Sequence, residues 1–126
     1  MKFRAICENH LYVKAYSRGK RYVGKALAFY VLPDYRADKI RRAHPEKKKI
    51  NRLGLTVSKK LGSAVVRSRA RRIMREAYRL TTRELNLKQG YLIVIAAREA
   101  AVHMKSTDLL PEMKKAFEKL QMVVPS

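Results

Sequence analysis

The segment at 53–80, LGLTVSKKLGSAVVRSRARRIMREAYRL, constrains the fold more than any other part of the sequence. Its first six residues alternate between apolar and small or polar side chains, which is the period-two pattern of a half-buried strand. A break at Gly62 follows, and Ser63 can then cap a helix because its hydroxyl accepts a hydrogen bond from a first-turn N–H. The segment therefore predicts a strand, a glycine turn, and a helix that runs from near Ala64 to about Leu85.

The predicted helix separates apolar and charged residues onto different sides, at about 100° per residue. The apolar stripe comprises Val66, Ala70, Ile73, Ala77 and Leu80, and the arginine row comprises Arg67, Arg71, Arg75 and Arg79, with Arg72 beside the row and Arg69 at the border of the stripe. Like charges at this spacing destabilise a helix, and Glu76 is the only acid in the segment. A solvated helix face is the alternative interpretation. Arginine, however, suits phosphate groups and stacking on bases, so the row predicts contact with nucleic acid.

The charge of the whole chain supports the same interpretation. Lys and Arg number 30 against 10 acids in 126 residues, which gives a formal net charge of +20 and a pI near 10.6. Such a charge requires a polyanionic partner or abundant counterions. A membrane surface is also anionic, but the sequence has no apolar run of about 18 residues and no signal-peptide pattern. We therefore expect residues 1–126 to form a single domain that binds nucleic acid, with no membrane partner.

Cysteine and histidine usage argues against a metal site in the protein. The single cysteine, Cys7, excludes an intramolecular disulfide and a cysteine-rich zinc site. The histidines, His10, His44 and His103, are far apart in the sequence and show no metal-ligand spacing. The sequence therefore predicts no metal and no cofactor bound by the protein alone, and a reduced, cytoplasmic location.

The remaining sequence predicts an α+β layer structure. In chain order the predicted elements are a helix capped by Asn9 and stopped by Gly19, strands at 21–23 and 26–32, the strand and helix described above, a strand at 91–97, and a last helix capped by Ser106 or Thr107. Residues 33–51 contain two prolines and many basic residues, which predicts a long, flexible basic loop that adds charge without sequence readout. Tyr12 and Tyr16 are four residues apart on the first helix, so both rings project from one face, either into the core or along the rim of a cleft.

The segment GLTVSKKLGSAVVRSRARRIMREAYR at 54–79 resembles the signature of the bacterial ribonuclease P protein family. That signature is a strand ending in Ser-Lys-Lys, a glycine turn, and a helix that starts with Arg-Asn-Arg. In this chain Ser68 replaces the usual asparagine, and the flanking arginines are intact. The tyrosines of the first helix, Tyr30 and the IAARE stretch at 95–99 also lie where the family has its counterparts. The long segment at 33–51 is a departure from the family.

The resemblance implies a fold and two surfaces that bind RNA. The fold would be the two-layer α-β-β-β-α-β-α sandwich shared with the second domain of ribosomal protein S5, with a left-handed strand–helix–strand crossover against the general right-handed rule. A catalytic RNA subunit would be bound by Lys59, Arg67, Ser68, Arg69, Arg71, Arg72 and Arg75. The single-stranded 5′ leader of precursor tRNA would lie in a cleft formed by Tyr12, Tyr16, Tyr30, Ser58 and Lys60, where aromatic rings stack on bases with little sequence preference.

The reaction that the resemblance implies is hydrolysis of one phosphodiester bond. The resemblance also implies one protein bound to each RNA subunit. We expect no catalytic residue in the protein, because the scarce acids form no cluster that could hold two metal ions. The RNA subunit with its Mg²⁺ would then carry the catalysis, and the protein would be an accessory subunit that is inactive alone. It would bind the leader and neutralise the charge of the RNA.

Two other classes of function stay open from the sequence alone. A structural ribosomal or ribosome-assembly protein would account for the charge, the size and the order of elements, but not for the tyrosines. A stand-alone RNA or DNA binder would account for the charge. Co-purification with one discrete catalytic RNA, with ribosomal subunits or with no defined RNA would discriminate among the three.

Overall fold

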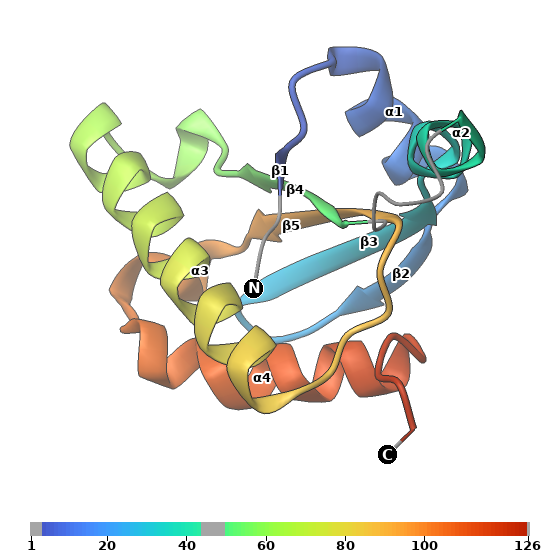
Figure 1. Cartoon of the computed structure of the whole chain (residues 1–126). Helices are drawn as coiled ribbons and strands as arrows, with labels where there is room; N and C mark the ends of the chain where they lie inside the picture. Colours follow the sequence, from blue (N-terminus) through green and yellow to red (C-terminus); the bar gives the residue numbers. More distant parts are fainter. Residues whose placement is uncertain (1–3, 44–49, 126) are drawn as a thin grey trace.

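The structure is a computed structural model that describes residues 4–43 and 50–125, without the side chains of residues 4, 37, 38, 40 and 41. The chain is built around one mixed five-stranded sheet of order β1-β4-β5-β3-β2 (Figure 1). In chain order the elements are β1 (Arg4–Ala5), α1 (Asn9–Arg18), β2 (Lys20–Val23), β3 (Leu27–Pro33), α2 (Tyr35–Ala43), β4 (Arg52–Thr56), the 3₁₀ turn η1 (Lys59–Leu61), α3 (Ala64–Glu84), β5 (Tyr91–Ala97), the 3₁₀ turn η2 (Glu99–His103) and α4 (Ser106–Lys119). The predicted α-β-β-β-α-β-α order is confirmed, and β1, α2 and the two 3₁₀ turns are additions to it.

Strand β5 lies at the centre of the sheet, antiparallel to β3 and parallel to β4. Its side chains are buried on both faces of the sheet, as its continuous apolar run predicts. Ile93 and Ile95 join the main core, whereas Leu92 and Val94 belong to a smaller cluster on the opposite face. The strand therefore holds the two sides of the molecule together.

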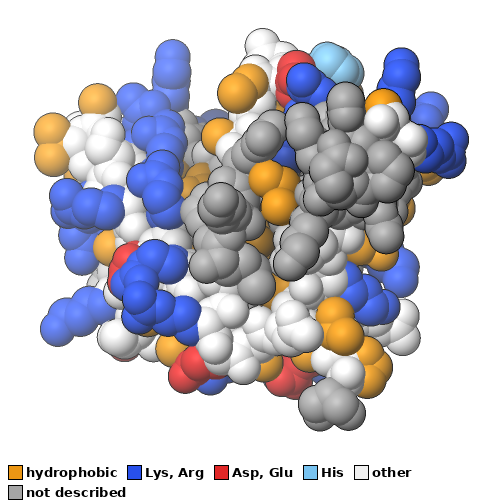
Figure 2. Space-filling model, viewed as in Figure 1, with side chains coloured by type: hydrophobic (Ala, Val, Ile, Leu, Met, Phe, Trp, Pro, Cys, Tyr) orange, Lys and Arg blue, Asp and Glu red, His pale blue; other side chains and the backbone are white. Residues whose placement is uncertain are grey.

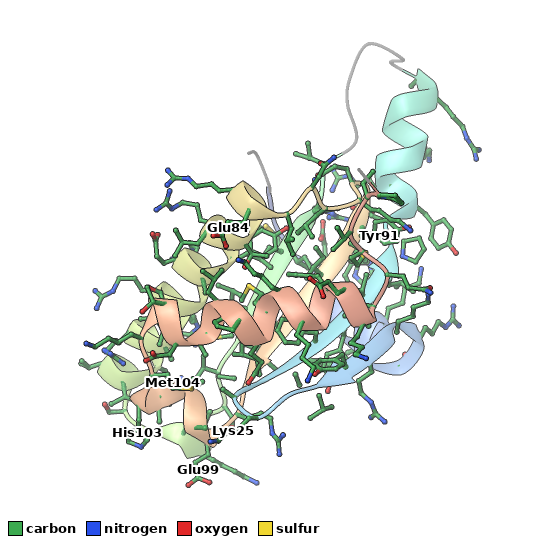
Figure 3. The ribbon with its side chains drawn as sticks, turned by 90° about the horizontal axis from the view of Figure 1, so that it is seen from below. Lys25, Glu84, Tyr91, Glu99, His103 and Met104 are labelled. Carbon is green, nitrogen blue, oxygen red and sulfur yellow. The ribbon has the colours of Figure 1, made fainter. Side chains whose placement is uncertain are left out.

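Helices α3 and α4 lie side by side over one face of the sheet and enclose the main core (Figure 3). The predicted apolar stripe of α3 is confirmed in part, since Ala70 and Ala77 are buried and Ile73 packs against the main core. The buried side chains are Ala70, Met74, Ala77, Tyr78, Thr81 and Thr82, whereas Val66 is 37% exposed and Ile73 and Leu80 are half-buried. Thr81 can be buried because its hydroxyl donates to the carbonyl of Ala77 at 2.8 Å. The helix is therefore turned so that larger and internally bonded residues fill the core.

Helix α3 makes the crossover between the parallel strands β4 and β5. It begins after Ser63, whose hydroxyl accepts from the amide of Val66 at 3.4 Å, so the predicted cap is confirmed. With α3 in front of the sheet and both strands pointing up, β5 lies to the left of β4 (Figures 1 and 3). The crossover is therefore left-handed, as the resemblance implies.

Helix α1 crosses the other face of the sheet and covers the smaller apolar cluster. Ala15 is fully buried in that cluster and Leu11 packs at its edge. The chain leaves α1 at Gly19, where a Cβ would lie 2.6 Å from the carbonyl oxygen of Ala15, so only glycine permits this close approach. The predicted caps of the first and last helices differ from those observed, since Glu8 rather than Asn9 precedes α1. Before α4 the cap position is Lys105, whose amide donates to Asp108 at 2.9 Å, and not Ser106 or Thr107.

The predicted loop at 33–51 is wrong in its first half, because residues 35–43 form α2. The helix starts after Asp34, whose carboxylate accepts a hydrogen bond from the amide of Arg36 at 3.1 Å. An aspartate in that position satisfies a first-turn N–H that a loop would leave to water. Residues 44–49 of the predicted loop lie outside the described residues.

Candidate nucleic-acid interface

The arginines of α3 occupy the outer side of the helix. Arg72 lies two residues from both Ala70 and Met74, about 200° around the helix from each of these buried side chains, and is exposed. Arg75 is also exposed, and Arg71 is half-buried beside it. Lys and Arg side chains gather over α3 on the left side of Figure 2. Within the described part of the chain these three guanidinium groups make no hydrogen bond or ion pair, so they are available to an external anion.

Three other arginines of α3 are held by the protein itself. Arg67 donates from Nε to the carbonyl of Gly62 at 3.3 Å. Arg69 donates to the carbonyls of Val102 at 3.2 Å and Met104 at 3.4 Å, where η2 ends. The remaining contacts join Arg79 to Glu76, and this hydrogen-bonded ion pair lowers the pKa of Glu76 and raises the pKa of Arg79. The predicted RNA contacts of Arg67 and Arg69 therefore compete with bonds that fix the ends of neighbouring turns.

A hollow of about 480 Å³ lies beside this row of arginines. It is lined by Arg72, Ile73, Arg75, Glu76 and Arg79 of α3 and by Ser106 at the start of α4. Its arginines present several N–H donors around one opening, which is the arrangement that phosphate oxygens require. Lys59, in η1, and Ser68, in the first turns of α3, are both exposed.

The three predicted tyrosines come together between α1 and the sheet. The rings of Tyr16 and Tyr30 meet edge to face, with centroids 4.8 Å apart and planes at 86°. The Tyr16 hydroxyl lies 3.1 Å from the hydroxyl of Thr56, and Tyr16 is 43% exposed. Tyr12 donates to the carbonyl of Ile6 at 3.3 Å, and its partial burial, with smaller contributions from Tyr16 and Cys7, raises its pKa. Tyr16 is therefore open to solvent, whereas Tyr12 and Tyr30 are half-buried and pack against the smaller apolar cluster.

The sheet face beneath these tyrosines carries small residues. Gly54 lies beneath Tyr12, since a Cβ there would be 2.6 Å from the tyrosine ring. One row across β3, β5 and β4 consists of the paired residues Ala28, Ala96 and Thr56. The neighbouring row on the same face contains Tyr30 and Gly54. Sequence reasoning missed Thr56, although the period-two pattern of its strand places it on the same face as Gly54.

The prediction that Ser58 and Lys60 lie on the tyrosine-bearing face of the sheet is wrong. Both residues lie beyond the sheet. Strand β4 ends at Thr56, and the hydroxyl of Ser58 accepts from the amide of Lys60 at 3.3 Å to start η1. Both residues are exposed. They therefore sit on the connection that joins the tyrosine cleft to the arginine helix.

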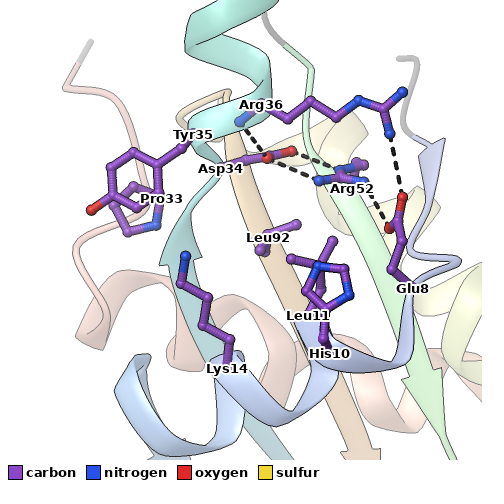
Figure 4. Close-up of a pocket in the computed structure, with 10 residues that line it drawn as sticks. All are labelled: Glu8, His10, Leu11, Lys14, Pro33, Asp34, Tyr35, Arg36, Arg52 and Leu92. Atoms are coloured by element: carbon purple, nitrogen blue, oxygen red, sulfur yellow. Dashed lines mark hydrogen bonds and ion pairs between the residues drawn. The ribbon is translucent and has the colours of Figure 1, made fainter.

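A buried ion-pair network at the other side of α1 was not predicted. The guanidinium of Arg52 donates to Asp34 from Nε at 2.7 Å and from Nη2 at 3.0 Å, and to Glu8 from Nη1 at 3.1 Å (Figure 4). These partners, led by the hydrogen bonds to Asp34, raise the pKa of Arg52. Glu8 also pairs with Arg36 at 3.3 Å. The sequence has no signal for this network because its members are far apart along the chain.

In residues 4–43 and 50–125, no three His, Cys, Asp or Glu side chains gather into a metal-ligand group. None of the helices in the same ranges is long and apolar enough to cross a membrane.

A family model described as Ribonuclease P matches residues 1–121. The chain belongs to the ribonuclease P protein family. The ribonuclease P protein component of Clostridium acetobutylicum is 36% identical over 124 residues, which is 98% of this chain and 94% of the relative. That of Clostridium perfringens is 39% identical over 96 residues, which is 76% of this chain and 71% of the relative. The resemblance of the 54–79 segment to the ribonuclease P signature is therefore confirmed.

Solved ribonuclease P proteins also share the fold. The Staphylococcus aureus protein matches with a TM-score of 0.74 at 21% identity, over 98% of this chain and 100% of that one. The Thermotoga maritima protein matches with a TM-score of 0.66 at 18% identity, over 89% and 96% of the two chains. The predicted α+β sandwich is therefore confirmed, and ribonuclease P membership is favoured over the ribosomal-protein alternative.

Proposed function

We propose that this protein is the RNA-binding subunit of a bacterial ribonuclease P and assists a catalytic RNA in removing the 5′ leader of precursor tRNA. Family membership supports the holoenzyme assignment. The observation that carries the proposal is the pairing of an aromatic cleft on one face of the sheet with uncompensated arginines on the helix that covers the other face. A single-stranded leader and a folded RNA subunit require these two kinds of surface.

The outer side of α3 is the proposed contact with the RNA subunit. Arg71, Arg72 and Arg75 project from a helix whose cap and core contacts fix its position. Little side-chain and no backbone entropy is lost when such a surface binds phosphate. Lys59 and Ser68 extend the contact toward η1, while Arg69 positions η2 beneath it.

The tyrosine cleft is the proposed leader site. Tyr16 and Tyr30 present partly exposed ring surface above small floor residues, and a base stacks on such a ring whatever its identity. This tolerance suits a leader whose sequence differs among tRNAs. Ser58 and Lys60 lie where a strand leaving the cleft would reach the arginine helix.

The protein's part in the chemistry is electrostatic. Mg²⁺ bound to the RNA subunit would supply the activation of water for phosphodiester hydrolysis. The arginines and lysines reduce the repulsion between RNA phosphates, which favours binding of substrate and of metal ions to the RNA. One protein bound to one RNA subunit in the cytoplasm would be sufficient for this role.

Reconstitution with a bacterial ribonuclease P RNA and precursor tRNA tests the proposal. Protein alone should leave the substrate intact, and protein plus RNA should cut it at the 5′ end of the mature tRNA. Tyr16→Ala should weaken binding by about 1–3 kcal/mol for a leader of several nucleotides, but not for a leader of one nucleotide. Tyr16→Phe is the matched control because it keeps the ring. An equal loss on both leaders, accompanied by a lower melting temperature, would assign Tyr16 to the core.

The RNA-subunit contact has its own pair of variants. Arg72→Ala should weaken binding of the RNA subunit and lower the slope of log affinity against log salt by about 1 for one lost phosphate contact. Arg79→Ala removes the same charge from the same helix, but from a side chain already paired with Glu76. Equal effects of the two substitutions on affinity and salt slope would contradict a specific contact by Arg72.

A further inference from the structure

A second concave site lies on the side of α1 away from the tyrosine cleft. It is a pocket of about 160 Å³ between α1 and the start of α2 (Figure 4). Lys14, which lines it, is two residues from both Tyr12 and Tyr16 and therefore lies about 200° around the helix from each. The pocket and the cleft are thus separate sites on opposite sides of one helix.

The pocket combines an apolar floor with an aromatic and cationic rim. Leu11, Leu92 and Pro33 contribute apolar lining. Tyr35 is 64% exposed, and the amino group of Lys14 lies 5.0 Å from the centre of its ring. A base that displaces this amino group would stack on the exposed ring, and the released ammonium would lie within a few ångströms of the phosphate of the same nucleotide.

The wall that bears Tyr35 is fixed by the buried ion pairs. Asp34 accepts two hydrogen bonds from Arg52 and one from the amide of Arg36, which ties the first turn of α2 to β4. Glu8 bonds both arginines and ties the start of α1 to the same point. A ligand that enters the pocket therefore meets a preformed wall and does not have to order it.

The charges of the lining favour an anion. Its two acids, Glu8 and Asp34, are bonded to Arg36 and Arg52, which leaves Lys14 as the cation without an acidic partner among the described residues. His10 adds a further nitrogen to the rim. The volume is below the range of about 300–1,000 Å³ that holds drug-sized ligands, so one base fits inside, its sugar and phosphate would lie at the rim beside Lys14, and a folded helix does not fit.

We propose that this pocket binds one unpaired nucleotide of RNA, with the base stacked on Tyr35 and its phosphate bound by Lys14. The proposal rests on the RNA-binding function proposed above, but it assigns a site outside the tyrosine cleft and outside the arginine helix. The nucleotide comes either from the RNA subunit or from the precursor tRNA. Both sources offer the same chemistry, and separate binding measurements distinguish them.

The test uses the reconstituted ribonucleoprotein with Tyr35→Ala and Lys14→Ala. One measurement gives the affinity of the protein for the RNA subunit, and the other gives the affinity of the assembled enzyme for precursor tRNA with a leader of several nucleotides. Tyr35→Ala should weaken one of these affinities at least about fivefold, the lower limit for one stacked base. Lys14→Ala should lower the salt slope by about 1 in the same measurement. An effect on RNA-subunit affinity or on precursor affinity identifies the source of the nucleotide.

Three binding controls and a melting curve separate stacking from charge and from folding. Tyr35→Phe keeps the ring and should bind as the wild type does. Lys39→Ala removes an exposed charge of α2 that does not line the pocket, and should weaken binding less than Lys14→Ala. Polyphosphate, which has no bases, should bind Tyr35→Ala and wild-type protein equally. Melting curves should match, because Tyr35 is exposed.

The proposal is overturned if Tyr35→Ala binds both RNAs as the wild type does, or if it loses affinity for polyphosphate to the same degree. Preferential binding of an acidic peptide in place of RNA, abolished by Lys14→Ala, would also overturn it. A wild-type protein that fails to bind the RNA subunit would instead refute the proposed ribonuclease P function. A normal wild-type enzyme with unaffected pocket variants refutes the nucleotide site alone.

Discussion

Removal of the Asp34 carboxylate is expected to destabilise the protein by about 4 kcal/mol. The Asp34 and Arg52 side chains are only 4% and 10% exposed, and breaking a buried pair by removing one partner costs about 3–5 kcal/mol. Glu8 remains bonded to Arg52 in the Asp34→Ala variant. The cost of breaking the Asp34–Arg52 pair therefore lies near the lower end of that range, at about 3 kcal/mol. Loss of the cap on the first turn of α2 adds about 1 kcal/mol.

Urea unfolding followed by far-ultraviolet circular dichroism measures this loss. A second variant, Asp34→Ala with Arg52→Met, removes both charges, and it should be more stable than Asp34→Ala alone because no unpaired guanidinium stays buried. Glu76→Ala is the control, since it breaks an ion pair on the surface of α3 and should change the midpoint little. If Asp34→Ala and Glu76→Ala unfold at the same urea concentration, the buried network does not stabilise the fold as argued.

Three further outcomes are expected. Gly54→Ala should displace the Tyr12 ring, because the added Cβ would lie 2.6 Å from it, and should therefore weaken binding of a long leader. A fall in melting temperature without a change in leader affinity would contradict this expectation. Burial raises the pKa of Tyr78 from 10.0 to about 12, so its stabilising effect is complete below about pH 10 and is lost as the pH rises toward 12. Urea midpoints should fall over that interval in wild type more steeply than in Tyr78→Phe, and equal slopes would refute the reasoning. Glu112→Ala should lower the free energy of unfolding, measured in urea, by about 1.5–3 kcal/mol, because the carboxylate accepts hydrogen bonds from the amides of Ala26 and Leu27 at 2.7–3.1 Å. Glu112→Gln should lower it by less.

Elements with a strong local signal could be predicted from the sequence. The continuous apolar run of β5 is buried on both faces because both faces are covered. The start of α3 follows from Ser63, whose cap is a contact between residues three apart. The assembly of the tyrosines was implied by the family resemblance, since their spacing alone left a core role open.

Features that depend on distant residues could not be predicted in the same way. The buried side of α3 was predicted only in part, because burial of Tyr78 and Thr81 is decided by partners in the fold and not by hydropathy. Strand β1 has two residues and exists only through its pairing with β4. Helix α2 was hidden by the high charge of its sequence, although Asp34 is a local cap signal. The pocket beside α1 requires Arg52, which no pattern connects to Glu8.

The position of the sheet between α1 and α3 sets the distance between the two proposed RNA-binding surfaces. The tyrosines lie on the α1 face, whereas the arginines project from the outer side of the helix that covers the other face. Two RNA strands bound at these surfaces would be kept apart by the combined thickness of one sheet and one helix layer. The protein would then act as a rigid spacer. The closely packed layer of β5 and Met74, which lies between the two RNA strands, would determine the distance between the leader and the RNA subunit.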